Sequence, residues 1–246
     1  MGIRLEFHTV IDTTQRRAHE LVEQHNRRYD AVYADHQTAG RGRQGTAWYD
    51  APGQSLLTSL ILWDMPIPAP AGVVGVCAAL AAAEALELHY PDLPLVRVKY
   101  PNDLLVNGRK LGGVLVERVR DTAVVGIGIN LGQTEFPPEL QPIAISVWQA
   151  CGRWGSKGTF VPPSERAALI EAIWGRLSAL ISLWRDQPTQ VHARWQARDD
   201  TPTRAYRAQD LPQQPIGIAL GVSPEFQLIL RLPDGTIHNT YYASAV

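Results

Sequence analysis

Residues 95–119 read LVRVKYPNDLLVNGRKLGGVLVERV, and apolar and polar side chains alternate through most of this stretch. Alternation with a period of two is typical of a strand that buries one face. We therefore predict strands at 95–100, 104–107 and 112–119. Asn107-Gly108 lies between the last two, and this dipeptide is the strongest short signal for a tight hairpin turn. The stretch predicts consecutive strands of a β-sheet.

The segments on either side extend this sheet and add helices. We expect strands at 5–11, 31–35, 55–62 and 123–131, a helix at about 14–28 with Thr13 as its N-cap, and a helix at 72–89. A further helix follows from Ser164, a possible cap, because apolar residues then recur every three or four positions. Strands and helices do not alternate one by one, which favours an α+β fold over a Rossmann fold.

The C-terminal segment has a different pattern. Residues 216–243 alternate as short strands around the turn Pro233-Asp234-Gly235. We expect a small β domain at 200–246 beside a larger domain at 1–190.

Composition excludes several classes of protein. The 246 residues are 45% hydrophobic and 19% charged with a net charge of -1, which is typical of a globular protein without a strong field for nucleic acid or membrane. Cys77 and Cys151 are isolated, so neither a disulfide framework nor a metal site built from a residue cluster is expected. Because no signal peptide is visible and the apolar run 71–88 carries Glu84 and Glu87, we expect a cytoplasmic protein.

Residues 34–50, ADHQTAGRGRQGTAWYD, combine glycines with arginines. Glycine permits close approach of the backbone to a ligand, and Arg41 and Arg43 supply permanently charged donors suited to carboxylate and phosphate. The run matches neither the P-loop nor the dinucleotide fingerprint. It predicts an anion-binding loop, with a solvated turn or a nucleic-acid contact as alternatives.

A second group of polar residues lies within 99–130. Lys99 projects from the strand face opposite Val98 and Tyr100, and Lys110 precedes two glycines, Gly112 and Gly113, where a ligand could lie against the backbone. Asn102 and Asp103 could serve a ligand or only the local turn. Asn130 ends an apolar strand, where its amide must find partners or face a cleft.

Three of these motifs together resemble the biotin protein ligase family. They are GRGRQGTAW (40–48), KYPNDLLVNGRKLGGVLVE (99–117) and GIGIN (126–130), supported by DTTQ (12–15) and Gln37. The resemblance covers residues 5–185. It implies a class II synthetase-like biotin/lipoate ligase fold, a mixed sheet flanked by helices, with a small SH3-like C-terminal domain.

The resemblance also implies a reaction in two steps. Biotin and ATP, with Mg²⁺, give biotinyl-5′-AMP and pyrophosphate, and the biotinyl group then passes to a lysine of a biotin carboxyl carrier protein, such as that of acetyl-CoA carboxylase. The chain begins within a few residues of the first expected strand, so the winged-helix DNA-binding domain of bifunctional members is not expected, and neither nucleic acid nor membrane is an expected partner. Family members occur as monomers and homodimers.

The matching positions carry the family's site residues. Lys110, placed at the reacting carboxylate and α-phosphate, is the expected main catalytic charge, with Arg41 as its helper. Biotin contacts are expected from Thr13, Thr14, Gln15, Gln37, Arg41, Gly42, Arg43, Lys110 and Gly112. Contacts with ATP or the adenylate are expected from Arg41, Arg43, Trp48, Lys99, Asn102, Lys110 and Asn130. Gln15 departs from the asparagine that is usual in the family.

Two other functions remain in competition. Lipoate ligases share the fold and the use of a lysine on phosphate, and differ mainly in the acyl pocket. A single-stranded nucleic-acid-binding module could use Arg41, Arg43 and Trp48 instead, and its affinity would fall steeply with salt. The glycine-arginine loop and the KYPND motif favour biotin.

Overall fold

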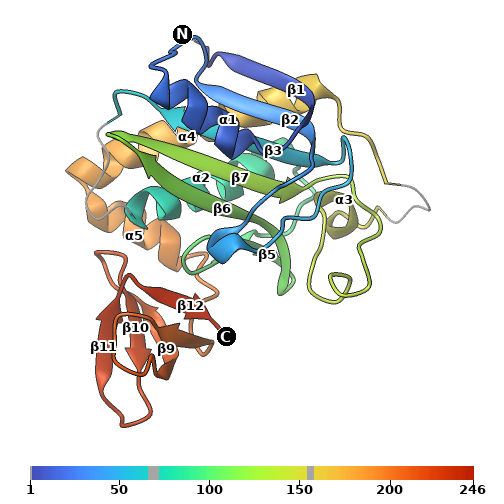
Figure 1. Ribbon diagram of the computed structural model, residues 1–246. Helices are drawn as coiled ribbons and strands as arrows, with labels where there is room; N and C mark the ends of the chain where they lie inside the picture. The colour runs from blue at the N-terminus through green and yellow to red at the C-terminus, as the bar shows by residue number, and fades with distance from the viewer. Residues whose placement is uncertain (1, 66–71, 154–157) are drawn as a thin grey trace.

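A seven-stranded mixed sheet forms the centre of the protein in a computed structural model that describes residues 2–65, 72–153 and 158–246 (Figure 1). The strand order is β1-β2-β3-β7-β6-β5-β4, and only β1 and β2 are parallel. The strands are β1 (Leu5–Ile11), β2 (Ala31–Gln37), β3 (Ser55–Leu62), β4 (Arg97–Lys99), β5 (Asp103–Val106), β6 (Arg109–Val119) and β7 (Thr122–Asn130). The predicted α+β class is confirmed.

Helices cover the two faces of this sheet unequally. The apolar side chains of α1 pack on one face, against Val32, Ile61 and Val124, whereas α2 and α4 join the larger core on the opposite face. The helices are α1 (Thr14–Glu23), α2 (Gly72–His89), α3 (Val147–Ala150), α4 (Pro163–Asp186) and α5 (Pro188–Gln196). Because α1 is short, it covers only part of its face.

Two predicted helix boundaries are wrong. Residues 14–28 were expected to be helical, but α1 ends at Glu23 because His25 takes the left-handed conformation (φ 52°) and the Asn26 amide donates back to the Leu21 carbonyl at 2.8 Å. Ser164 does not cap α4, which begins with Pro163 in the first turn, where a missing N–H costs nothing.

The hairpin turn is confirmed, and the strand after it begins earlier than expected. Asn107 and Gly108 both have positive φ, 51° and 74°, as a two-residue hairpin turn requires. Strand β6 then starts at Arg109 rather than at residue 112, since Arg109 and Lys110 pair with Val106 and Leu105 before a β-bulge at Leu111 in β6. Lys110 therefore belongs to a strand, which limits its freedom.

A second, five-stranded antiparallel sheet has the order β11-β10-β9-β8-β12. Its strands are β8 (Ala205–Ala208), β9 (Ile216–Val222), β10 (Leu228–Arg231), β11 (Ile237–Thr240) and β12 (Ala243–Ala245). The alternation at 216–243 missed β8, which lies in a polar stretch. Tyr100 connects the two sheets, because its hydroxyl donates to the Phe226 carbonyl at 3.2 Å and its carbonyl accepts from the Tyr206 hydroxyl at 2.9 Å.

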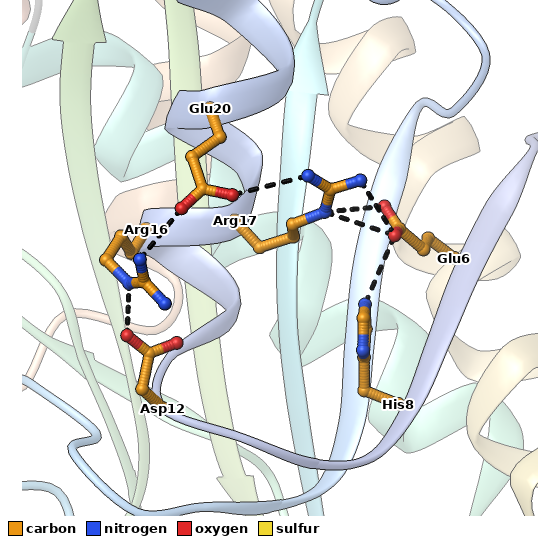
Figure 2. A network of polar contacts seen from close by, with 6 residues as sticks. All are labelled: Glu6, His8, Asp12, Arg16, Arg17 and Glu20. Carbon is orange, nitrogen blue, oxygen red and sulfur yellow. Dashed lines mark hydrogen bonds and ion pairs between the residues drawn. The ribbon is translucent and has the colours of Figure 1, made fainter.

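Charged side chains hold α1 in place beside β1 (Figure 2). Arg17 donates to Glu6 of β1 at 3.0 Å and to Glu20 at 3.3 Å, and Arg16 connects Glu20 with Asp12. Partly exposed pairs contribute little singly, but a network of them fixes an orientation. The N-terminus of α1, which carries predicted site residues, is thereby positioned on the sheet.

Helices α2 and α4 are long and apolar enough to cross a membrane by length and composition alone. The most apolar window of α2 is 72% buried inside the fold. Its apolar character is therefore that of a core helix, as expected from the sequence.

Candidate functional site

A cavity of about 380 Å³ lies beside α1, on the sheet face that this helix leaves partly open. Its wall is formed by the N-terminus of α1, the glycine-arginine loop, strands β3, β6 and β7, and Ser244 and Ala245 of β12. The predicted residues that line it are Thr13, Thr14, Gln15, Gln37, Arg41, Gly42, Arg43, Trp48, Lys99, Asn102, Lys110 and Asn130. Gly112 is not part of the lining, and its neighbour Gly113 is.

Three glycines form the floor of the cavity, and two of them, Gly126 and Gly128, make room for one functional side chain each. A β-carbon on Gly126 would lie 2.7 Å from Gln15 Oε1, and one on Gly128 would lie 2.7 Å from the Trp48 ring. At Gly113 the Lys110 side chain lies 3.5 Å from such a position. In the motif GIGIN, alternation directs both glycines to the cavity and both isoleucines to the core.

The N-terminus of α1 forms a polar end of the cavity. Thr13 caps the helix, as predicted, by accepting from the Gln15 amide at 3.2 Å. The Thr14 amide and hydroxyl donate to Gln37 Oε1 at 2.7 and 3.0 Å, and the Thr14 hydroxyl lies 2.9 Å from that of Ser59. This end offers neutral hydroxyl and amide groups.

Gln15 connects this polar end to three strands of the sheet, β3, β6 and β7. Its Nε2 donates to Glu117 Oε2 at 2.9 Å and to the Val124 carbonyl at 3.4 Å, while its Oε1 accepts from Ser59 Oγ at 2.9 Å. Ser59 and Glu117 were not predicted. Alternation could have found Glu117, since it shares a strand face with Gly113.

The glycine-arginine loop is closed by its own backbone. The Gly42 amide donates to the Thr46 carbonyl at 2.7 Å and the Trp48 amide to the Gly40 carbonyl at 3.0 Å. Arg43 donates to Asn102 Oδ1 at 3.4 Å, which brings the loop to the strand that carries Lys99. Trp48 Nε1 is buried and has no hydrogen-bond partner within the described ranges, so the indole is held by packing on Gly128.

Asp103 lies between two lysines at the cationic end of the cavity. Its oxygens are 2.7 Å from Lys99 Nζ and 2.7 Å from Lys110 Nζ. Burial raises the pKa of this carboxyl, but the charges of Lys110 and then Lys99 outweigh it, so the pKa lies below its usual value. Lys110 Nζ also lies 5.9 Å from the centre of the Trp48 ring. Asp103 therefore lines the cavity and pairs with both lysines, so a role in the local turn alone, one of the two alternatives from the sequence, does not describe it.

Asn130 lies at the end of β7 with a buried side chain. Its Nδ2 donates to the Ile145 carbonyl at 3.2 Å and its Oδ1 accepts from Gln133 at 3.4 Å. These contacts suit a strand-end cap as well as a ligand contact. Its expected role in reading adenine stays a prediction.

The described segments contain no group of three or more histidine, cysteine, aspartate or glutamate residues that could hold a metal ion. The oxygens nearest to the two lysines belong to Asp103, and Asn102 adds an amide oxygen. Oxygen ligands of this type suit Mg²⁺, which proteins usually bind through one or two side chains together with the phosphate oxygens of a substrate.

Comparison with known proteins matches the chain to one protein family and to individual members of it. Residues 7–133 match the biotin/lipoate A/B protein ligase family. The bifunctional ligase/repressor BirA of Bacillus subtilis is 33% identical, over 96% of this chain and 71% of that protein. The biotin–(acetyl-CoA-carboxylase) ligase of Mycobacterium tuberculosis is 31% identical, over 84% and 74%.

Solved structures agree in fold. The biotin protein ligase of Aquifex aeolicus, in complex with biotin and ATP, superposes with a TM-score of 0.80 at 24% identity, over 99% of this chain and 98% of that one. The alignment spans both sheets. The same two-sheet arrangement is therefore present in a structure that holds both ligands.

Proposed function

Because the chain belongs to the biotin/lipoate A/B protein ligase family, we propose that it activates biotin with ATP and transfers the biotinyl group to a lysine of a biotin carboxyl carrier protein. The observation that carries this proposal is the polarity of the cavity. One end presents neutral hydroxyl and amide groups, the other presents cations, and a glycine floor joins them.

The neutral end suits the bicyclic head of biotin. The ureido ring has two N–H donors and one carbonyl acceptor, which match the hydroxyls of Thr14 and Ser59 and the amides of Gln15 and Gln37. The dithiolane head of lipoate has no such donors or acceptors, so it would leave these partly buried groups unpaired. The same family also contains lipoate ligases, and this end of the cavity disfavours that alternative.

The cationic end suits the reacting groups. An oxygen of the biotin carboxylate attacks the α-phosphorus of ATP, the bond to the bridging oxygen breaks, and pyrophosphate leaves with that electron pair. Two anions must approach one another in this step, and Lys110 and Lys99 offset their repulsion and the charge that develops at phosphorus. Arg41 and Arg43 lie on the loop beside them. Mg²⁺ that accompanies ATP would take phosphate oxygens together with the oxygens of Asn102 and Asp103.

The second step needs no nucleophile from this chain. A neutral lysine amine of the carrier protein attacks the carbonyl carbon of the mixed anhydride, and AMP leaves. Because the anhydride is already activated, positioning of the amine suffices. The relative from Mycobacterium tuberculosis is named for acetyl-CoA carboxylase, and we propose the same class of acceptor here.

Replacement of Lys110 tests the site. Lys110→Ala should lower the rate of biotin-dependent pyrophosphate release about 100-fold or more, because removing one preorganised charge from a transition state costs about two to three orders of magnitude. Lys110 is half-exposed and Asp103 keeps its ion pair with Lys99, so the variant should remain folded at the assay temperature, which a melting curve checks. Pyrophosphate release at the parent rate would show that Lys110 is not the principal catalytic charge.

A further inference from the structure

Gln15 lines the cavity, and its side chain reaches Glu117, a residue of β6 that is not part of the cavity lining. Both Nε2 hydrogens are used inside the protein, toward Glu117 Oε2 at 2.9 Å and the Val124 carbonyl at 3.4 Å. Neither partner can donate a hydrogen bond when Glu117 is ionised. The amide group is therefore held in one of its two orientations.

The orientation that results places an acceptor in the cavity. Gln15 Oε1 lies over Gly126, where a β-carbon would be 2.7 Å away, and Gly126 belongs to the floor. The Ser59 hydroxyl donates to one lone pair of Oε1 at 2.9 Å. A carbonyl oxygen has two lone pairs, so one remains for a ligand. That ligand group has to be a hydrogen-bond donor.

We propose that Glu117 is a positioning residue that determines substrate specificity by orienting Gln15. With Glu117 in place, Gln15 Oε1 accepts from a ureido N–H of biotin and rejects acyl heads that carry no N–H in that position. This inference rests on the proposed function and names the element of the site that selects among acyl substrates. Glu117 acts through Gln15 and has no contact with the reacting carboxylate.

The surroundings of Glu117 suit such a role. Its side chain is 43% exposed, so the fold does not depend on burying it. His19 Nε2 lies 3.0 Å from the oxygen that Gln15 also contacts, one helical turn beyond Gln15 on α1. Arg17, on the same helix, is paired with Glu6 and Glu20 and turns away toward β1 (Figure 2).

Glu117→Gln tests the role with almost no change of shape. A glutamine at 117 can donate as well as accept, so it no longer fixes the Gln15 amide, and the Gln15 NH₂ group can face the ureido N–H. We expect the KM for biotin in pyrophosphate release to rise about tenfold, the effect of about one neutral hydrogen bond. The kcat and the KM for ATP should stay within about twofold, because the cationic end is untouched.

A matched control and a double variant separate positioning from a general effect of charge. Glu171 is exposed on α4, and Glu171→Gln should leave every constant unchanged. Gln15→Met removes the amide at similar length and should itself raise the KM for biotin. Adding Glu117→Gln to Gln15→Met should then give no further increase, since residues that act through one contact are not additive.

The outcomes distinguish this inference from the proposed function. An active parent protein with an unchanged KM for biotin in Glu117→Gln overturns the role of Glu117 alone, and so does a double variant whose two effects simply multiply. A folded parent protein that releases no pyrophosphate with biotin overturns the proposed function and the role of Glu117 with it. Equal melting temperatures of all variants exclude loss of the fold as the cause.

Discussion

At the scale of single residues, one carboxylate organises the cationic end of the cavity. Asp103 is 14% exposed and binds Lys99 and Lys110 at the same time. Without it, two ammonium groups would face one another in a partly buried space, where like charges repel more strongly than in water. Asp103 therefore holds both lysines ready for a phosphate group, which can replace its oxygens.

Asp103→Asn should lower the free energy of unfolding at pH 7 by about 1–2 kcal/mol, less than the loss of a fully buried pair because both lysines retain solvent. The pKa of Asp103 is lowered in the folded state, so its stabilisation is present above the unfolded value of 3.8 and is lost as the pH falls through the folded value. The difference between parent and variant should shrink below that pH. Urea denaturation at neutral and acid pH measures it, and a difference that grows in acid would contradict this account.

Most of the predicted residues that line the cavity come from short motifs of the sequence. The loop arginines, Trp48 and Lys110 were found because charge and glycine occur together in short stretches. Ser59 and Glu117 were missed, since their partner Gln15 lies 44 and 102 positions away along the chain and no local pattern indicates either contact. Alternation predicts a face, but it does not predict the partner across the sheet.

At the scale of elements, strand β7 combines two tasks by alternation. Ile127 and Ile129 pack in the core, whereas Gly126 and Gly128 leave space for Gln15 and Trp48 on the cavity side. Glycine weakens a strand because it has no side chain to pack. Its presence twice in the central part of the sheet is explained by the two side chains that lie on it.

Gly128→Ala should displace the Trp48 indole, because a methyl group there would be 2.7 Å from the ring. We expect the KM for ATP to rise about tenfold, within the range found for loss of an aromatic stacking contact. Stability should change little. Gly175→Ala on α4, where a β-carbon meets nothing within 4 Å, is the control and should stabilise the helix by about 0.5–1 kcal/mol. Unchanged KM values in Gly128→Ala would exclude Trp48 as part of the ATP site.

Element boundaries were predicted well where residues with strong conformational preferences, such as glycine, proline or asparagine, mark them. The bounds of β3 and α2 agree with the predicted 55–62 and 72–89, and the Asn107-Gly108 turn is where it was expected. The end of α1 was misplaced because residues 24–28 contain neither glycine nor proline, so the sequence carries no local signal for the backbone reversal at His25. Strand β8 was missed because its pairing with β9 and β12 depends on tertiary contacts rather than on its own polar sequence.

At the scale of the whole molecule, the two sheets share a core and a cavity. Trp195 is fully buried, and its ring centre lies 6.3 Å from that of Tyr100 and 5.9 Å from that of Phe226. Tyr100 belongs to the cavity wall, and β12 contributes Ser244 and Ala245 to the same wall. The C-terminal sheet thus contributes to the cavity wall; the sequence predicted a small β domain at 200–246 but did not indicate its role.

Trp195→Ala should lower the free energy of unfolding by about 3–5 kcal/mol, as expected for a large aromatic side chain lost from a core. Since Trp195 contacts groups of both sheets, tryptophan fluorescence and far-UV circular dichroism should report one common transition in the parent. Trp148→Ala, at a partly exposed position on α3, is the control and should cost less. Two separate transitions in the parent would show that the sheets unfold independently.

The central claim is that this cavity activates biotin and delivers it to a lysine. Its most direct test is mass spectrometry of a recombinant biotin carboxyl carrier domain after incubation with the protein, MgATP, and biotin and lipoate in competition. We predict the mass of one biotinyl group on a single lysine, absent when Lys110→Ala replaces the parent protein over the same short time. Two results would contradict the account: a lipoyl group on the carrier domain, or a carrier domain that stays unmodified after prolonged incubation with the parent protein, MgATP and biotin.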